Sequence, residues 1–157
     1  MSKPNAVPSK ELLLEMFDYK DGELYRKPEK AGTIDGGGYV QTGIKGVYYK
    51  NHRLIFMMHH GYVPEFIDHI DGNKLNNRIE NLRPATKSEN QYNKKLKRKT
   101  LSGIKGITWR RDSKKWRAKI TVDGKDITIG NYVDIEDAKQ AIQKARADLH
   151  KQFANNG

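Results

Sequence analysis

The hydrophobic residues in the first half of the chain fall in short runs separated by turn-forming residues, a pattern that predicts small helices and hairpins. The apolar runs predict helices from Lys10 to about Phe17 and from His52 to about His60. Hairpin turns are expected at 21–22 and 45–46, where a glycine can accept the positive φ of a tight turn. Asn51 is expected to cap the second helix, because its side chain can accept a hydrogen bond from the first helical turn.

The middle of the chain predicts a strand, a loop, a second strand and a helix. Apolar residues flank polar ones over 66–70 and again over 82–85, and the turn-forming run 71–73 lies between them. Thr86 is followed three residues later by Glu89, the signature of a capping box. A helix is therefore expected to begin at this point.

Alternating apolar and polar positions in the last third predict a three-stranded antiparallel sheet packed on one helix. The strands are expected near 106–111, 115–122 and 125–129, and the helix over about 135–150. The apolar residues of the central strand share one face, which the helix should cover. The opposite face then carries polar and basic residues, namely Thr108, Arg110, Arg117, Lys119, Thr121 and Thr128.

Four polar residues of the middle segment have the chemistry of a hydrolytic site, namely Asp68, His69, Asn81 and Asn90. The side-chain oxygens of Asp68 and Asn90 are hard ligands that suit Mg²⁺ or a similar divalent cation. His69 can accept a proton from water, and Asn81 can bond the loop backbone and fix its shape. An EF-hand calcium loop is excluded, because Ile70 stands where that motif needs an oxygen ligand.

The segment from about His52 to Asn93 resembles the HNH endonucleases of the ββα-metal class. The resemblance rests on Asp68-His69 and on the asparagines that follow His69 by 12 and 21 positions. It implies that His69 is the general base that activates water. Asp68 and Asn90 would hold a catalytic Mg²⁺, or another divalent cation such as Mn²⁺, and Asn81 would be structural.

Three further histidines lie on the expected second helix, at His52, His59 and His60. His52 and His59 are two turns apart, and His59 and His60 point in different directions, so structural roles are favoured over metal binding. The sequence His52-Arg53-Leu54 also resembles the stretch that precedes the motif in this HNH subfamily. The resemblance implies a supporting role for that stretch.

In the composition, the net charge is the feature that indicates a class of partner. The chain has 157 residues, enough for one ordinary domain or two small ones. Its net charge of +11, from 30 Lys+Arg against 19 Asp+Glu, favours a nucleic-acid partner over a basic protein without one. The sequence holds no cysteine, which excludes disulfide-linked partners and Cys-ligated zinc sites. No apolar run is long enough for a membrane span and the N-terminus lacks an apolar signal core, so a cytoplasmic protein without a membrane partner is expected.

A basic stretch follows Asn93 and is either a solvated charge run or a linker that contacts the DNA backbone. Its place between two candidate DNA-binding units favours the contact. The basic candidates are Lys94, Lys95, Lys97, Arg98 and Lys99, and Arg78 and Arg83 are further candidates for phosphate contact. We expect an HNH nuclease domain over 1–97, a basic linker over 98–103 and a sheet-plus-helix DNA-binding domain over 104–157.

The last of these units resembles the plant ethylene-response-factor (APETALA-type) DNA-binding domain. The matching pieces are Gly106-Ile107, Lys115-Trp116 with Ala118 and Ile120, Ile129-Gly130-Asn131-Tyr132, and the Ala-rich helix. The resemblance implies that the polar face of the sheet enters the major groove of double-stranded DNA. Thr108 and Lys119 depart from the plant pattern, which usually has an arginine and an acidic residue at these positions, so the target sequence does not transfer.

The whole sequence predicts an α+β protein, with a ββα-metal nuclease unit on an N-terminal hairpin-rich scaffold and a separate sheet-plus-helix domain. The combination resembles the free-standing homing endonucleases of bacteriophages, which implies nicking or cleavage of DNA in the host-cell cytoplasm. The cutting chemistry is expected to need only residues 52–93 on their scaffold. The alternative is a DNA-binding regulator with a catalytically inactive nuclease fold. The sequence defines no oligomeric state.

Overall fold

The computed structural model describes residues 6–93 and 101–151. They combine helices and strands in the predicted α+β fold, and the chain divides into two compact units, Met1–Ala85 and Thr86–Gly157. This division comes earlier than the predicted nuclease boundary at residue 97 and leaves the last HNH helix in the second unit. No helix in the described ranges is long and apolar enough to cross a membrane.

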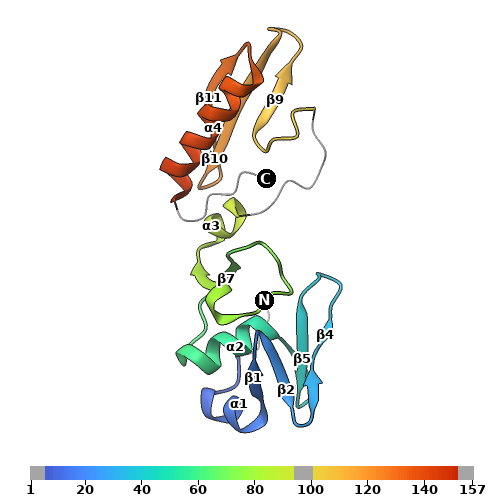
Figure 1. The fold of residues 1–157 in the computed structure, drawn as a ribbon. Helices are drawn as coiled ribbons and strands as arrows, with labels where there is room; N and C mark the ends of the chain where they lie inside the picture. The colour runs from blue at the N-terminus through green and yellow to red at the C-terminus, as the bar shows by residue number, and fades with distance from the viewer. Residues whose placement is uncertain (1–5, 94–100, 152–157) are drawn as a thin grey trace. The chain divides into compact units, whose positions relative to one another are not determined.

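The first unit begins with a short helix and two small sheets (Figure 1). Ser9 caps the helix by accepting a hydrogen bond from the backbone N–H of Leu12. The predicted hairpin turns are confirmed, with positive φ at both residues of 21–22 and of 45–46. The elements are α1 (Lys10–Met16), β1 (Asp18–Lys20), β2 (Glu23–Arg26), β3 (Glu29–Ala31), β4 (Thr33–Ile34), β5 (Val40–Ile44) and β6 (Val47–Lys50).

Helix α2 (Asn51–His60) supplies much of the core of the first unit. Its Leu54, Ile55 and Phe56 are at most 1% exposed and pack in one cluster with Leu13 of α1 and Leu24 of β2. Full burial of such a side chain contributes about 1.5–3 kcal/mol to folding. The core therefore fixes α2 between α1 and the small sheets.

The prediction that Asn51 caps α2 is wrong. Lys50 is the N-cap residue and Asn51 is the first helical residue. The Asn51 side chain accepts a hydrogen bond from Thr42 Oγ1 at 2.7 Å and donates one to the carbonyl of Ala31 at 3.3 Å. These tertiary bonds occupy the amide that a cap would have needed, and they tie α2 to β5 and β3.

The predicted strand, loop and strand follow α2. Strand β7 (Phe66–His69) pairs antiparallel with β8 (Leu82–Ala85), and the one-turn 3₁₀ helix η1 (Ile79–Asn81) precedes β8. In this register Asp68 lies opposite Arg83 and His69 lies opposite Leu82. The hairpin therefore places Asp68 and His69 at the end of a strand, where the loop leaves it.

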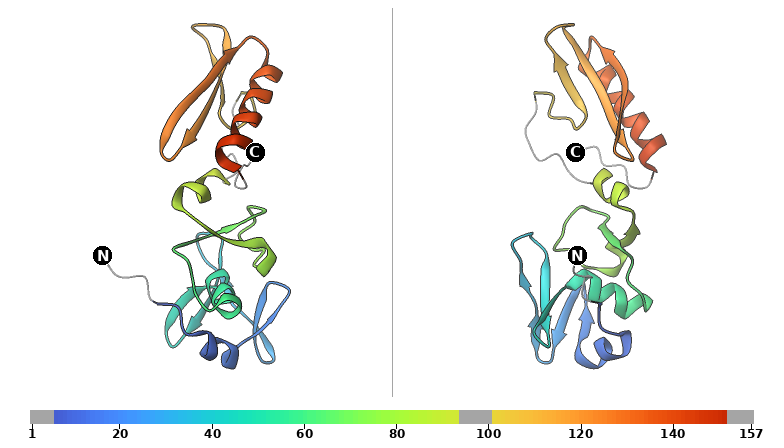
Figure 2. Two further views of the ribbon diagram at one scale, coloured as in Figure 1. Left: turned by 90° about the vertical axis from the view of Figure 1, so that its left-hand side faces the viewer. Right: turned by 180° about the vertical axis from the view of Figure 1, so that it is seen from behind.

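The second unit contains the predicted short helix α3 (Lys87–Tyr92) and the predicted sheet and helix. Strands β9 (Ile107–Arg110), β10 (Lys115–Val122) and β11 (Lys125–Tyr132) form an antiparallel sheet in the order β11-β10-β9. Helix α4 (Ile135–His150) lies along one face of this sheet (Figure 2). Its Ala138 and Ile142 are buried against Ile107, Ala118 and Ile120, as the alternating pattern predicts. A β-bulge follows Ala118.

Candidate functional site

Asp68 lies at the third position of β7 and is only 3% exposed. Its Oδ2 accepts a hydrogen bond from Arg83 Nε at 2.8 Å and forms an ion pair with Arg83 Nη2 at 2.7 Å. The two residues face each other across the β7–β8 hairpin, so the pairing follows from the register. Arg83, which the sequence suggests as a phosphate contact, is therefore engaged with the carboxylate of the candidate metal ligand.

His69 follows Asp68 and is 6% exposed. Its Nε2 lies 2.9 Å from Oδ1 of Asn77, a loop residue that is 3% exposed. Because an amide oxygen only accepts hydrogen bonds, Nε2 is the donor in this pair, and in the neutral ring Nδ1 then carries the lone pair. Sequence reasoning missed Asn77, since one asparagine in an Asn-rich loop has no pattern that distinguishes it.

Two more rings pack around His69. The ring of His52, from α2, lies 5.2 Å from it in an edge-on arrangement, and the ring of Tyr39 lies 6.1 Å away. Burial, followed by the charge of His69, lowers the pKa of His52 from 6.5 to about 3. His52 is thus a neutral ring that packs against His69, in agreement with the supporting role that the resemblance implies.

The loop between β7 and β8 is held by hydrogen bonds from Asn81. Its Oδ1 accepts from the backbone N–H of Asp71 at 3.0 Å, and its Nδ2 donates to Asp71 Oδ1 at 2.9 Å and to the carbonyl of Asn76 at 2.8 Å. Burial acts to raise the pKa of Asp71, but hydrogen bonds from Asn76, Asn73 and Asn81 together hold it below its ordinary value. The structure confirms that Asn81 bonds the loop backbone.

The same loop is seated on the β1–β2 hairpin. Tyr19 Oη accepts a hydrogen bond from the backbone N–H of Ile79 at 3.0 Å. Gly22 has a φ of +87°, and a Cβ at this position would come within 2.7 Å of the Arg78 backbone nitrogen. Any larger residue at 22 would push the loop away. The Arg78 guanidinium reaches Asp21 at 3.5 Å on the surface.

Asn90, the second predicted metal ligand, lies in α3 and so in the second unit. Helix α3 begins with the predicted capping box, in which Thr86 Oγ1 accepts from the Glu89 N–H and Glu89 Oε2 accepts from the Thr86 N–H. The structure thus brings Asp68 and His69 together in β7. The meeting of Asn90 with them remains a prediction.

The donor chemistry of the first unit suits a hard cation. Mg²⁺ is usually held by one or two carboxylates together with water and substrate phosphates. Asp68 supplies one carboxylate, one residue before His69 in β7, and carboxylate oxygens are hard ligands of the kind that such a cation prefers. Within the described ranges, no three His, Asp or Glu side chains gather as a metal-binding group.

The predicted DNA-binding residues divide between two regions. The basic candidates at positions 94, 95, 97, 98 and 99 lie outside the described residues. On the sheet, Lys119 Nζ donates to Asp126 Oδ2 at 2.7 Å, and Thr121 Oγ1 donates to Asp126 Oδ1 at 2.6 Å. Arg110 Nε donates to Asp112 Oδ1 at 3.0 Å. Two acids, Asp112 and Asp126, therefore lie among the basic side chains.

The remaining sheet candidates differ in exposure. Thr108 is exposed, whereas Arg117 is half-buried and its Nε is buried without a hydrogen-bond partner. The hydrogen bonds from Arg110 and from the Ser113 backbone N–H hold the pKa of Asp112 below its ordinary value. The polar face is thus a mixed surface whose positive charge is partly balanced by its own carboxylates.

Comparison with known proteins identifies the family. Residues 49–92 match the family model described as HNH endonuclease. The chain is 36% identical over 107 residues to Protein 3.8 of Escherichia phage T7, which covers 67% of this chain and 88% of that protein. It is 34% identical over 106 residues to an uncharacterized HNH endonuclease of Acanthamoeba polyphaga mimivirus, which covers 66% of this chain and 54% of that protein. No solved structure matches the chain significantly.

The chain therefore carries an HNH endonuclease domain and has phage and viral relatives. The matched segment contains the hairpin with Asp68, His69 and Asn81 and all of α3. The likeness of the sheet-and-helix unit to a plant DNA-binding domain remains a prediction.

Proposed function

We propose that this protein is a metal-dependent endonuclease that hydrolyses phosphodiester bonds in double-stranded DNA. The observation that carries the proposal is the pairing of His69 Nε2 with Asn77 Oδ1, one residue after Asp68 in β7, inside the HNH domain. A histidine held in one tautomer beside a hard metal ligand is suited to activating water at a phosphate.

His69 acts as the general base. With Nε2–H directed at Asn77, the lone pair on Nδ1 accepts a proton from the attacking water. The water oxygen forms a bond to phosphorus, and the bond between phosphorus and the leaving sugar oxygen breaks. The buried ring of His52 and the half-buried ring of Tyr39 pack against His69 and restrict the ring to a narrow range of orientations.

Asp68 would hold the metal, Mg²⁺ or Mn²⁺, and the sequence motif assigns Asn90 as a second ligand. When bound, the metal supplies positive charge that stabilises the phosphate oxygens and the leaving oxygen. Arg83 orients the Asp68 carboxylate through a hydrogen bond and an ion pair to Oδ2. Asn81 keeps the loop, and with it Asn77, in place.

The finer assignment is a phage homing endonuclease with a separate DNA-recognition domain, acting in the cytoplasm of the host cell. Its support is the net charge of +11, the basic stretch after Asn93 and the viral relatives. Positive side chains bind DNA by releasing counterions from phosphates, which gives affinity without sequence preference. Site preference would come from the polar face of the β9–β11 sheet.

The test is cleavage of supercoiled plasmid with Mg²⁺ or with EDTA, by the full chain and by His69→Ala. Metal-dependent nicking or linearisation by the wild type, lost in the variant, is the expected result. His60→Ala is a matched control, because His60 is an exposed histidine of the same unit. DNA binding without cleavage under every metal condition would instead support the regulator with an inactive nuclease fold.

A further inference from the structure

Helix α3 is too short to be stable by itself, since it has only six residues. Its capping box secures the first turn, and its last residue, Tyr92, is 8% exposed. A buried tyrosine at the end of such a helix indicates that the helix is held by what the ring packs against. The partners of Tyr92 all belong to the sheet-and-helix part of the second unit.

The Tyr92 side chain is anchored at both its hydroxyl and its ring. The hydroxyl donates to Asp123 Oδ1 at 2.9 Å and accepts from the Asp123 backbone N–H at 2.8 Å. The ring stacks on His150 with centroids 3.8 Å apart and planes within 5°. His150 is in turn fixed by its Nε2, which donates to the carbonyl of Thr121 at 3.0 Å. The turn after β10 and the end of α4 thus both bind the Tyr92 side chain.

The backbone of α3 is also bound. Lys105 Nζ donates to the Tyr92 carbonyl at 3.0 Å, and the Lys105 carbonyl accepts a hydrogen bond from Arg146 of α4. A cation at the carbonyl end of a helix is favourable to its dipole. Three separate segments therefore contact the last residue of α3, two of them through hydrogen bonds.

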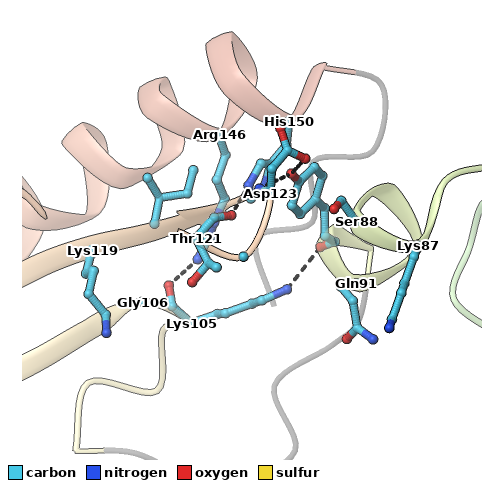
Figure 3. Close-up of a pocket in the computed structure, with 13 residues that line it drawn as sticks. Lys87, Ser88, Gln91, Lys105, Gly106, Lys119, Thr121, Asp123, Arg146 and His150 are labelled. Carbon is cyan, nitrogen blue, oxygen red and sulfur yellow. Dashed lines mark hydrogen bonds between the residues drawn. The ribbon is translucent and has the colours of Figure 1, made fainter. Parts of the chain in front are cut away.

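The anchored face of α3 is not the face that carries Asn90. Lys87, Ser88, Gln91 and Tyr92 of α3 line a cavity of about 570 Å³ together with Asp123 and His150 (Figure 3). Asn90 does not line it, and two residues along a helix are roughly 200° apart around its axis. With Tyr92 anchored on Asp123 and His150, the Asn90 side chain therefore points away from the sheet.

We propose that Tyr92 is a positioning residue: by docking α3 on Asp123 and His150, it makes the sheet-and-helix unit hold the predicted metal ligand Asn90 in place. This inference rests on the proposed function. This role of Tyr92 revises the expectation that residues 52–93 on their scaffold suffice for cutting. Asp123 and His150, which hold Tyr92, lie outside that segment.

Calorimetric titration of the full-length chain with Mn²⁺ tests the inference, with Tyr92→Phe, Asp123→Ala and the double variant. Loss of the hydroxyl bond to the Asp123 carboxylate should weaken Mn²⁺ binding about three- to ten-fold. Tyr92→Phe also removes the bond that the hydroxyl accepts from the Asp123 backbone N–H, so the double variant should bind Mn²⁺ about as well as Tyr92→Phe alone. Tyr48→Phe is the matched control, because Tyr48 is 68% exposed on the first unit.

Affinity for DNA, measured without metal, should stay within about two-fold in Tyr92→Phe, because counterion release depends on charges that this substitution leaves unchanged. Unchanged Mn²⁺ binding in Tyr92→Phe, or a wild type that does not bind Mn²⁺, would overturn the inference. Loss of DNA affinity without loss of Mn²⁺ affinity would do so too, because Tyr92 would then only support the fold of the unit. A wild type that binds Mn²⁺ but cuts no DNA would contradict the proposed function. The inference about Tyr92 would then still be decided by the Mn²⁺ affinities of the variants.

Discussion

His69 and Asn77 form a buried pair in which Nε2 of the histidine lies 2.9 Å from Oδ1 of the asparagine. The pair joins the end of β7 to the loop that Asn81 holds in place. It sets which ring nitrogen of His69 can take a proton, so the loop geometry and the chemistry of the base depend on each other.

Replacing Asn77 with Leu should lower the cleavage rate at least ten-fold, because the His69 tautomer is then no longer fixed and general-base catalysis contributes about 10²–10⁴-fold. DNA affinity should be unchanged. The free energy of unfolding should fall by about 1–3 kcal/mol, since a buried ring nitrogen loses its hydrogen bond. Single-turnover cleavage and urea unfolding measure both effects. Asn73→Ala, an exposed substitution in the same loop, is the control, and equal rates for the two variants would refute the role of Asn77.

Replacing Arg83 with Leu should destabilise the first unit by about 3–5 kcal/mol, because it removes one partner of a buried ion pair. Replacing Asp68 with Ala in the same chain should restore part of this loss, since no buried carboxylate then remains at that position. Urea unfolding of the two single variants and the double variant gives the coupling between the residues. Additive losses would show that the pair does not act as a unit.

The low pKa of His52 makes the first unit sensitive to acid. Its pKa in the folded chain is about 3 and its ordinary value is 6.5, so the unfolded chain binds more protons between these values. The stability that this group contributes is present above pH 6.5 and is lost as the pH falls toward about 3. The slope should be at most about 1.4 kcal/mol per pH unit. Urea unfolding across this range should show a smaller acid loss for His52→Phe, and equal slopes would contradict the buried neutral state.

Asp126, the acid on the sheet face, leads to the prediction that a substitution there strengthens DNA binding rather than weakening it. Asp126 accepts hydrogen bonds from Lys119 and Thr121, so Asp126→Asn should leave more positive charge on the surface. DNA binding should become tighter, and its salt dependence steeper by up to about 0.9 in the log–log slope for each added phosphate contact. Asp148→Asn, an exposed change of equal charge on α4, is the control. Weaker binding by Asp126→Asn alone would mean that Asp126 orients Lys119 rather than opposing it.

Most of the secondary structure is predictable from sequence, because it depends on local signals. The capping box at Thr86 and Glu89 and the glycine turns at 22 and 46 act within a few residues, and the alternation along β10 reflects one buried face. These signals also place Asp68 and His69 together at the end of one strand. The positions of Asp68 and His69, the central part of the candidate site, can therefore be predicted from the sequence.

The partners of these residues were not predictable, because each comes from a distant element or from a loop without periodicity. Arg83 reaches Asp68 through strand register, and Asn77 reaches His69 through a loop held by three hydrogen bonds. Asn51 has the sequence appearance of a cap, yet its amide serves Thr42 and Ala31. A hydrogen-bonding side chain has several possible partners, and tertiary packing decides among them.

The central claim is that His69 is the base of a DNA-cutting site, and single-turnover cleavage of a labelled duplex tests it most directly. His69→Ala should cut at least 100-fold more slowly than wild type at saturating Mg²⁺, as loss of a general base implies. Its dissociation constant for DNA should stay within about two-fold, because binding rests on phosphate contacts elsewhere. His60→Ala should match the wild type in both measurements. Wild-type cleavage rates in His69→Ala would contradict the account.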